Sequence, residues 1–228
     1  ELFPEIPIGV LDRDEVRRKG GLSSILATFE RGETRILIGT QMVAKGHHFP
    51  EVSLTAVLAA DSYLSFPDFR AVEKTYAQLV QLAGRAGRGQ RPGRFVVQTH
   101  HPDHYAIRAA LANDDDGFVR EELRFRRAFH YPPYTRMIQV LLRDRQRERG
   151  HRWMAELAAR LEAVRAGEPE LRLTGPAPAP FERLRGEWRF QLLLRGPSSA
   201  RLRDWLRSAL PVPWPRGLVV DVDPCHLL

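Results

Sequence analysis

Residues 39–50, with the sequence GTQMVAKGHHFP, combine small residues with an amide, a hydroxyl and a cation. Backbone N–H groups of such a loop, together with Thr40, Gln41 and Lys45, can bind phosphate oxygens. An ordinary turn between a strand and a helix is the alternative. The adjacent His47 and His48 point to different sides, so we do not expect them to bind a metal.

Residues 78–88, with the sequence QLVQLAGRAGR, contain Arg85 and Arg88, each preceded by a glycine. Gly84 and Gly87 allow a phosphate to approach the backbone closely. Arginine adds a permanent charge and a planar fork of donors that suits phosphate, and such residues can serve as arginine fingers. A basic helix end, where arginine meets the helix dipole favourably, explains the same spacing.

Two further polar clusters invite a metal interpretation, which we do not favour. His100, His101, Asp103 and His104 follow a predicted strand, and Pro102 with Asp103 suits a helix start. Asp114–Asp116 suits an exposed turn whose carboxylates favour the beginning of the next helix. We therefore predict no metal site in this chain.

The elements that position these residues alternate between strand and helix in the first part of the chain. Hydrophobic periodicity and turn signals predict helices over 12–30, 70–83 and 117–128 and from Tyr105, and strands over 35–38, 52–60 and 95–97. Such alternation is typical of a parallel sheet covered by helices, in which ligands bind beyond the carboxyl ends of the strands. The phosphate-type loop 39–50 follows a strand, as this rule requires.

The later part of the chain predicts a small α+β domain. Residues 130–134 (HYPPY) mark a boundary, so we divide the chain into 1–128 and 129–228. The predicted order is strand, helix, strand, strand, helix, strand, which is that of a ferredoxin-like split sheet. The segments are 137–142, 149–164, 171–173, 188–194, 199–210 with Ser198 as its cap, and 217–222. The proline-rich run 176–180 is interpreted as a stiff connector.

Composition and charge limit the class of protein. The 228 residues carry 35 basic and 28 acidic side chains, and a single cysteine excludes an internal disulfide. Residues 1–128 hold 18 basic and 17 acidic side chains, whereas 129–228 hold 17 and 11. The excess in the second part suggests a phosphate-bearing or acidic partner. An arginine bias of the genome is the alternative, because 32 of the basic residues are arginine.

Arginines alternate with aromatic residues between 181 and 190. Arg183, Arg185 and Arg189 suit contact with phosphates or an acidic protein tail, because basic and aromatic side chains together bind unpaired nucleic acid. We expect Trp188 and Phe190, by contrast, to belong to the core.

The two phosphate-type segments closely resemble motifs V and VI of superfamily 2 helicases. The detailed form resembles the PriA family of replication-restart helicases (primosomal protein N-prime), and the resemblance continues to the end of the chain. It rests on segments 39–50, 58–88, 99–104, 128–136, 175–194 and 219–224. The fold that it implies is an α/β, RecA-like helicase lobe followed by a small α+β C-terminal domain.

The resemblance also implies roles for individual residues. Arg85 and Arg88 would neutralise the γ-phosphate of ATP, and Gln81 would sense it. Gly46 and His48 would approach the nucleotide, together with the glycines at 84 and 87. Thr40, Gln41 and Lys45 would contact the DNA backbone. Asp61 and Arg70 would have structural or coupling roles.

Motifs of the first helicase lobe are absent from this sequence. It contains neither a G-x-x-x-x-G-K-[ST] loop, nor a D-E-x-H stretch, nor the C-x-x-C pairs through which the family binds zinc. We expect the ligands of ATP-bound Mg²⁺ and of Zn²⁺ upstream of Glu1, so this chain alone should not hydrolyse ATP. Cytoplasmic location, near the nucleoid, is expected.

The implied function is ATP-dependent 3′-to-5′ unwinding at stalled or repaired forks, with assembly of the primosome. Implied partners are forked and single-stranded DNA, the tail of the single-stranded-DNA-binding protein, other primosome proteins and the replicative helicase. Glu187 stands where relatives often carry a basic residue, which weakens the transfer of tail binding from the family to that position. The alternatives are a non-catalytic fork-binding scaffold with a decayed ATP site and another superfamily 2 fork-remodelling translocase.

Overall fold

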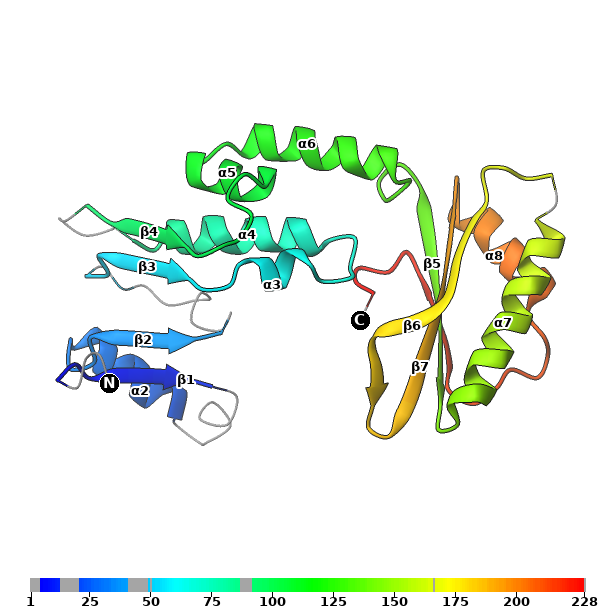
Figure 1. Cartoon of the computed structure of the whole chain (residues 1–228), viewed down its shortest axis with the longest axis horizontal. Coiled ribbons are helices and arrows are strands. Elements are labelled where there is room, and N and C mark those ends of the chain that lie inside the picture. Colours follow the sequence, from blue (N-terminus) through cyan, green and yellow to red (C-terminus); the bar gives the residue numbers. More distant parts are fainter. Residues whose placement is uncertain are drawn as a thin grey trace. The chain divides into compact units, whose positions relative to one another are not determined.

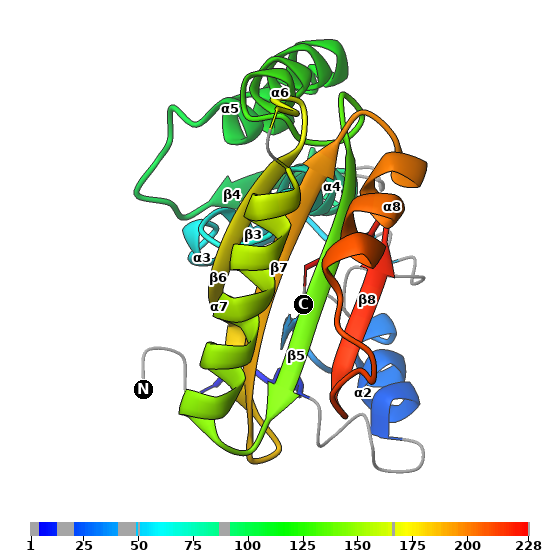
Figure 2. The same ribbon diagram turned by 90° about the vertical axis from the view of Figure 1, so that its right-hand side faces the viewer.

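The computed structural model describes residues 5–12, 21–40, 49, 51–86, 92–165 and 167–227. Within these residues the chain forms two compact units. The first contains the residues up to Asp61 together with Lys74–Asp115, and the second contains Ser62–Glu73 and the residues from Asp116 onward. Figure 1 labels the helices and strands of both except β8, which Figure 2 labels. The division at residue 128 stays a prediction.

The first unit consists of parallel strand pairs and helices. Strand β1 pairs with β2, and β3 pairs with β4, both in parallel. The parallel strands and helices expected of a helicase lobe are therefore confirmed. The strands are β1 (Ile8–Leu11), β2 (Ile36–Gly39), β3 (Leu54–Val57) and β4 (Arg94–Val97). The helices are α2 (Gly21–Glu30), α4 (Ala71–Ala83) and α5 (Tyr105–Ala112). Helix α4 belongs to this unit from Lys74 onward.

Two short elements were not predicted from the sequence. Strand β1 escapes detection because Pro7 and Gly9 interrupt its apolar run, and both residues weaken a strand signal. Helix α3 (Asp61–Leu64) is a single turn, too short to show a helical period.

The second unit is an antiparallel sheet with two helices on one face, preceded by helix α6 (Asp115–Ala128). The strand order is β6-β7-β5-β8, and every neighbouring pair is antiparallel. Figure 2 shows α7 and α8 lying across this face. The elements are β5 (Arg136–Asp144), α7 (Arg147–Val164), β6 (Arg172–Leu184), β7 (Glu187–Gly196), α8 (Ser199–Ala209) and β8 (Leu218–Val222). The predicted ferredoxin-like order is confirmed.

The core of the second unit lies between this sheet and its helices. Alternate residues of β5 and β7, among them Val140, Phe190 and Leu192, are at most 2% exposed and pack against both helices. The indole N–H of Trp205 on α8 donates to the carbonyl of Leu161 on α7 at 2.9 Å, which joins the two helices. No helix in the described part of the chain is both long and apolar enough to cross a membrane.

The proline-rich run 176–180 is part of strand β6, so its interpretation as a connector was wrong. Proline cannot donate a ladder hydrogen bond, but β6 is an edge strand and only one side needs pairing. The register shifts on either side of the pair Pro178–Phe190. Gly175 (φ +104°) allows β6 to approach the backbone of β7 closely, since a Cβ at Gly175 would lie 2.6 Å from the Gln191 carbonyl oxygen.

Candidate functional site

The end of helix α4 carries three of the predicted nucleotide-site residues. Gln81 lies in the last turn of α4, and Gly84 and Arg85 follow directly. The hydroxyl of Thr55 on β3 donates to the carbonyl oxygen of Leu82 at 3.1 Å. Leu79, only 1% exposed, anchors the same turn in the core. Strand β3 therefore fixes the position at which these polar groups leave the helix.

A surface hollow of about 640 Å³ lies at this point of the first unit. Its lining comes from the end of α4 and from the end of α5, which Asn113 closes in a left-handed conformation (φ 54°). The lining residues are Val80, Gln81, Ala83, Gly84, Arg85, Ala110, Leu111 and Asn113. An amide and a guanidinium from the predicted set thus border one recess that is open to solvent.

The remaining predicted residues of the helicase motifs lie differently. Thr40 follows β2 directly and is exposed at its carboxyl end. Gln41, Lys45, Gly46 and His48 lie outside the described residues, as do Gly87 and Arg88. The structure therefore brings Gln81, Gly84 and Arg85 together, and the roles assigned to all of these residues stay predictions.

Asp61 joins the chain segments that follow β3 and β4. Its carboxylate accepts the Thr99 hydroxyl at 2.7 Å and the backbone N–H of His100 at 3.0 Å. These hydrogen bonds, that of Thr99 first, lower the pKa of Asp61. Since both segments leave the carboxyl ends of parallel strands, Asp61 braces the edge of the sheet where ligands bind in such folds.

The histidine cluster at 100–104 forms a helix start. The Nδ1 atom of His104 accepts the N–H of Ala106 at 3.2 Å, so His104, not Asp103, caps α5.

Tyr76 on α4 donates its hydroxyl to Asp115 at the beginning of α6. Burial, with this carboxylate next to it, raises the pKa of Tyr76 to about 12. No cluster of potential metal ligands occurs in the described ranges.

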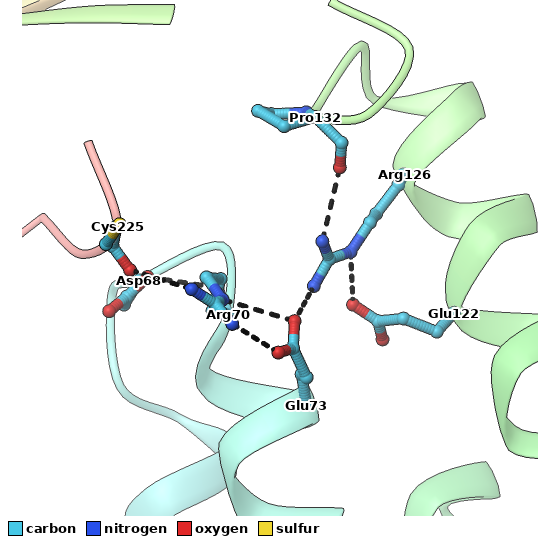
Figure 3. Close-up of polar contacts among 7 residues, drawn as sticks. All are labelled: Asp68, Arg70, Glu73, Glu122, Arg126, Pro132 and Cys225. Atoms are coloured by element: carbon cyan, nitrogen blue, oxygen red, sulfur yellow. Dashed lines mark hydrogen bonds and ion pairs between the residues drawn. The ribbon is translucent and has the colours of Figure 1, made fainter. Parts of the chain in front are cut away.

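Arg126 is the centre of a polar network in the second unit that sequence reasoning missed. It donates to Glu122 and to Glu73, both at 2.7 Å, and to the carbonyl of Pro132 at 3.2 Å (Figure 3). Its guanidinium also lies 5.6 Å from the ring centroid of Phe69. The i,i+4 spacing of Glu122 and Arg126 is visible in the sequence, whereas the contact with Glu73 spans 53 positions.

Arg70 enters the same network from the beginning of α4. It donates to both carboxylate oxygens of Glu73, at 3.2 and 2.5 Å, and to the carbonyl of Cys225 at 3.4 Å (Figure 3). The hydrogen bond from Arg70, followed by that from Arg126, lowers the pKa of Glu73. One carboxylate thus ties the start of α4, helix α6 and, through Arg70, the C-terminal segment together, which agrees with the structural role expected of Arg70.

The predicted DNA-contacting arginines are not equally accessible. Arg183 and Arg185 are exposed at the β6–β7 hairpin, and Arg185 occupies a left-handed conformation (φ 53°) in its turn. Arg189 is 6% exposed, and its guanidinium donates to the Phe181 carbonyl at 3.5 Å. Burial, followed by the charge of Arg143, lowers the pKa of Arg189. Phe190 lies in the core and Trp188 packs against it, as predicted.

Two guanidinium groups lie close to the ring of Trp188. Arg147 at the start of α7 lies 5.2 Å from its ring centroid, and Arg183 lies 5.3 Å from it. Cation–π contacts of this kind favour a fixed orientation of both arginines. Two of the predicted DNA-contacting arginines, Arg183 and Arg189, therefore have defined positions rather than free rotation in solvent.

Both parts of the chain match known family models. Residues 9–90 match the helicase conserved C-terminal domain, and residues 127–225 match the primosomal protein N C-terminal domain. Several curated proteins similar to this chain are named replication restart protein PriA. That of Haemophilus influenzae is 38% identical over 230 residues, which cover 99% of this chain and 31% of the relative.

Two further relatives agree. The protein of Synechocystis is 35% identical over 226 residues, covering 99% of this chain and 27% of its own length. The protein of Bacillus subtilis is 34% identical over 210 residues, which cover 92% of this chain and 26% of the relative. The chain thus spans less than a third of the length of these relatives. With both family models in their expected order and near-complete coverage of the chain, this protein belongs to the PriA family of replication restart proteins and corresponds to its helicase C-terminal and primosomal C-terminal domains.

Proposed function

We propose that this chain supplies the second-lobe half of an ATP site to a DNA helicase. Arg85 and Arg88 would neutralise the γ-phosphate, and Gln81 would sense its presence. The glycines at 46, 84 and 87 and His48 would allow the nucleotide close to the backbone. The observation that carries this proposal is the anchored end of α4, where Thr55 and the buried Leu79 hold Gln81 and Arg85 beside an open hollow.

A helicase domain implies the use of ATP, and the donor set fits part of that ligand. Gln81 and Arg85 offer hydrogen-bond donors to phosphate oxygens, whereas the described residues contain no cluster of side chains that could hold a metal. The Mg²⁺ that accompanies ATP would lower the charge of the phosphates, and its ligands would come from a first lobe. The chain alone is therefore expected to be inactive as an ATPase.

The second part of the proposal concerns DNA and replication restart. Thr40, Gln41 and Lys45 would contact the DNA backbone, and the arginines of the β6–β7 hairpin would contact a forked or single-stranded substrate. The intact helicase would unwind DNA from 3′ to 5′, bind the tail of the single-stranded-DNA-binding protein, and assemble the primosome with the replicative helicase. Support comes from the names of the relatives and from the exposed arginines of the second unit.

The alternatives lose support from specific observations. Another superfamily 2 translocase would not account for the match of residues 127–225 to the primosomal protein N domain. A scaffold with a decayed ATP site would have no need for an intact Gln81, Arg85 and Arg88.

The test is the DNA-stimulated ATPase of a family protein that contains these residues together with a first lobe. Arg85→Ala and Arg88→Ala should each lower turnover by about 10³-fold or more, as for other arginine fingers, while DNA affinity stays within about twofold. Arg108→Ala, an exposed arginine on α5, is the matched control and should keep normal turnover. Normal turnover in both finger variants would contradict the assignment.

A further inference from the structure

The sheet of the second unit gathers arginines at one of its ends. Because neighbouring strands are antiparallel, this end combines the end of β5, the β6–β7 hairpin and the start of β8. The first turn of α7 lies here too, as Figure 2 shows at the bottom of the view. We name it the arginine end, and it comprises Arg143, Arg145, Arg147, Arg149, Arg183, Arg185, Arg189 and Arg216.

The charge of the arginine end is only partly balanced. Eight guanidinium groups face four carboxylates in the same segments, namely Asp144, Glu148, Glu182 and Glu187. Asp144 pairs with Arg149 at 2.7 Å, and Glu182 pairs with Arg147 at 3.2 Å. Most of the excess positive charge of residues 129–228 therefore lies at this end of the sheet.

Two of these arginines are direct neighbours across the sheet. Arg143 on β5 is in register with Arg189 on β7, so their side chains leave the same face of the sheet. Arg189 is buried and forms no ion pair with any described carboxylate. Like charges opposite each other are unfavourable, and a buried cation without a counter-charge is costly. A bound anion would offset both the repulsion between the two arginines and the cost of the buried, unpaired charge.

The loop before β8 extends this row. The carbonyl of Gly217 accepts the N–H of Arg143 at 3.1 Å, which places the loop next to Arg143 on the side away from Arg189. Gly217 has φ +92°, and a Cβ there would lie 2.4 Å from the Arg143 carbonyl oxygen. The close approach fixes the loop against the end of β5.

This loop presents an exposed indole. Trp214 is 58% exposed and Val212 is 87% exposed, whereas Trp205 is 4% exposed in the core. Residues 205–220 contain no acidic side chain, and Arg216 follows the indole by two positions. A large aromatic surface left in water beside cations is typical of stacking platforms for unpaired bases.

We propose that the arginine end and Trp214 together form a binding site for single-stranded nucleic acid, with a base on the indole and phosphates on Arg143, Arg145 and Arg216. This inference rests on the proposed DNA binding of the chain and extends it from the hairpin to two further loops. A polypeptide partner is less favoured, because the cations outnumber the carboxylates at the arginine end and the segment 205–220 around Trp214 has no acidic side chain to bind a basic partner.

The test measures binding of a fluorescent oligothymidylate of about 20 nucleotides to the 228-residue chain by anisotropy. Trp214→Ala should weaken binding about fivefold or more without changing the salt dependence, and Trp214→Phe should restore most of the affinity. Phe129→Ala is the matched control, since Phe129 is 59% exposed elsewhere in the unit. It should bind as the unaltered chain does.

The arginines are tested by salt dependence. Arg216→Ala and Arg145→Ala should each lower the slope of log affinity against log salt by about 0.7. Arg172→Ala, an exposed arginine at the start of β6 and so at the opposite end of the sheet, is the control. The arginine variants should also weaken binding of a duplex of the same length. Trp214→Ala should leave duplex binding unchanged, because the bases of a duplex are already stacked.

The outcomes separate the inference from the function on which it rests. An unaltered chain that fails to bind either oligonucleotide would contradict the proposed DNA binding itself. Normal affinity and slope in Trp214→Ala, Arg145→Ala and Arg216→Ala, with an unaltered chain that binds, would overturn the inference alone and assign the exposed indole to a polypeptide partner. Because these side chains are exposed, circular dichroism should confirm an unchanged fold in every variant.

Discussion

The guanidinium of Arg126 donates to a carboxylate oxygen of Glu73 at 2.7 Å, although 53 positions separate the two residues in the chain. Glu73 stands in the first turn of α4, and the same helix ends at the predicted nucleotide-site residues. The contact therefore ties the start of this helix to α6 within the second unit (Figure 3).

Removal of this guanidinium should destabilise the second unit. Arg126 and Glu122 are 12% and 9% exposed, so Arg126→Ala would leave a buried carboxylate without its cation and should cost about 2–4 kcal/mol. Arg124→Ala is the control on the same helix, because its side chain is 76% exposed, and it should cost less than about 1 kcal/mol. Thermal unfolding measures both, and equal effects would contradict the role of the network.

Acid should weaken the same network. The folded pKa of Glu73 lies below its ordinary value of 4.5, so its stabilising contribution is fully present above that pH and is lost as the pH falls through the folded pKa. The stability difference between the unaltered chain and Glu73→Gln should therefore shrink as the pH is lowered. Denaturant unfolding across this pH range measures it. Glu156→Gln, exposed on α7, controls for the loss of one negative charge. Its stability difference from the unaltered chain should not shrink in this way as the pH is lowered.

A substitution in the turn of the β6–β7 hairpin should stabilise the second unit. Arg185 and Gly186 both have positive φ, 53° and 83°, as a two-residue type I′ turn requires. Asparagine adopts this conformation more readily than arginine, so Arg185→Asn should stabilise the unit by about 0.5–1 kcal/mol. The same variant should weaken binding to single-stranded DNA if Arg185 contacts phosphate. A fall in melting temperature would contradict the turn assignment.

The buried arginine of β7 should be dispensable for stability. Arg189→Met keeps an unbranched apolar stem but removes a buried charge that lies opposite Arg143, so the free energy of unfolding should stay unchanged or rise by about 1 kcal/mol. Arg183→Met, on the exposed strand end, should lose instead the contact with Trp188 and so lower stability slightly. A large loss of stability in Arg189→Met would indicate that its bond to the Phe181 carbonyl is essential.

Much of the fold follows from local patterns. The helical period predicts α4 over 70–83, and the helix covers Ala71–Ala83. Ser198 caps α8 as expected, its hydroxyl accepting the N–H of Arg201 at 3.3 Å. These features depend on groups within a few positions of each other, and such groups act in the same way wherever the segment lies.

Contacts between distant segments determine the features that local sequence patterns do not predict. The proline-rich run of β6 is a strand because it lies at a sheet edge, and no neighbouring residue encodes that position. For the candidate site, the residue types at 81–88 indicated phosphate chemistry, but Thr55 and Asp61, which brace the site and the sheet edge, act on groups 27 and 38 positions away.

The sequence by itself determined the family resemblance and the excess of arginine in residues 129–228, and it predicted the class of chemistry. Only the tertiary structure decided what each arginine does. Arg126 is neutralised in a network, Arg189 is buried beside Arg143, and Arg185 is exposed in a turn. The physical reason is that a guanidinium has the same charge everywhere, whereas its exposure and its counter-charges depend on segments brought together from distant parts of the chain.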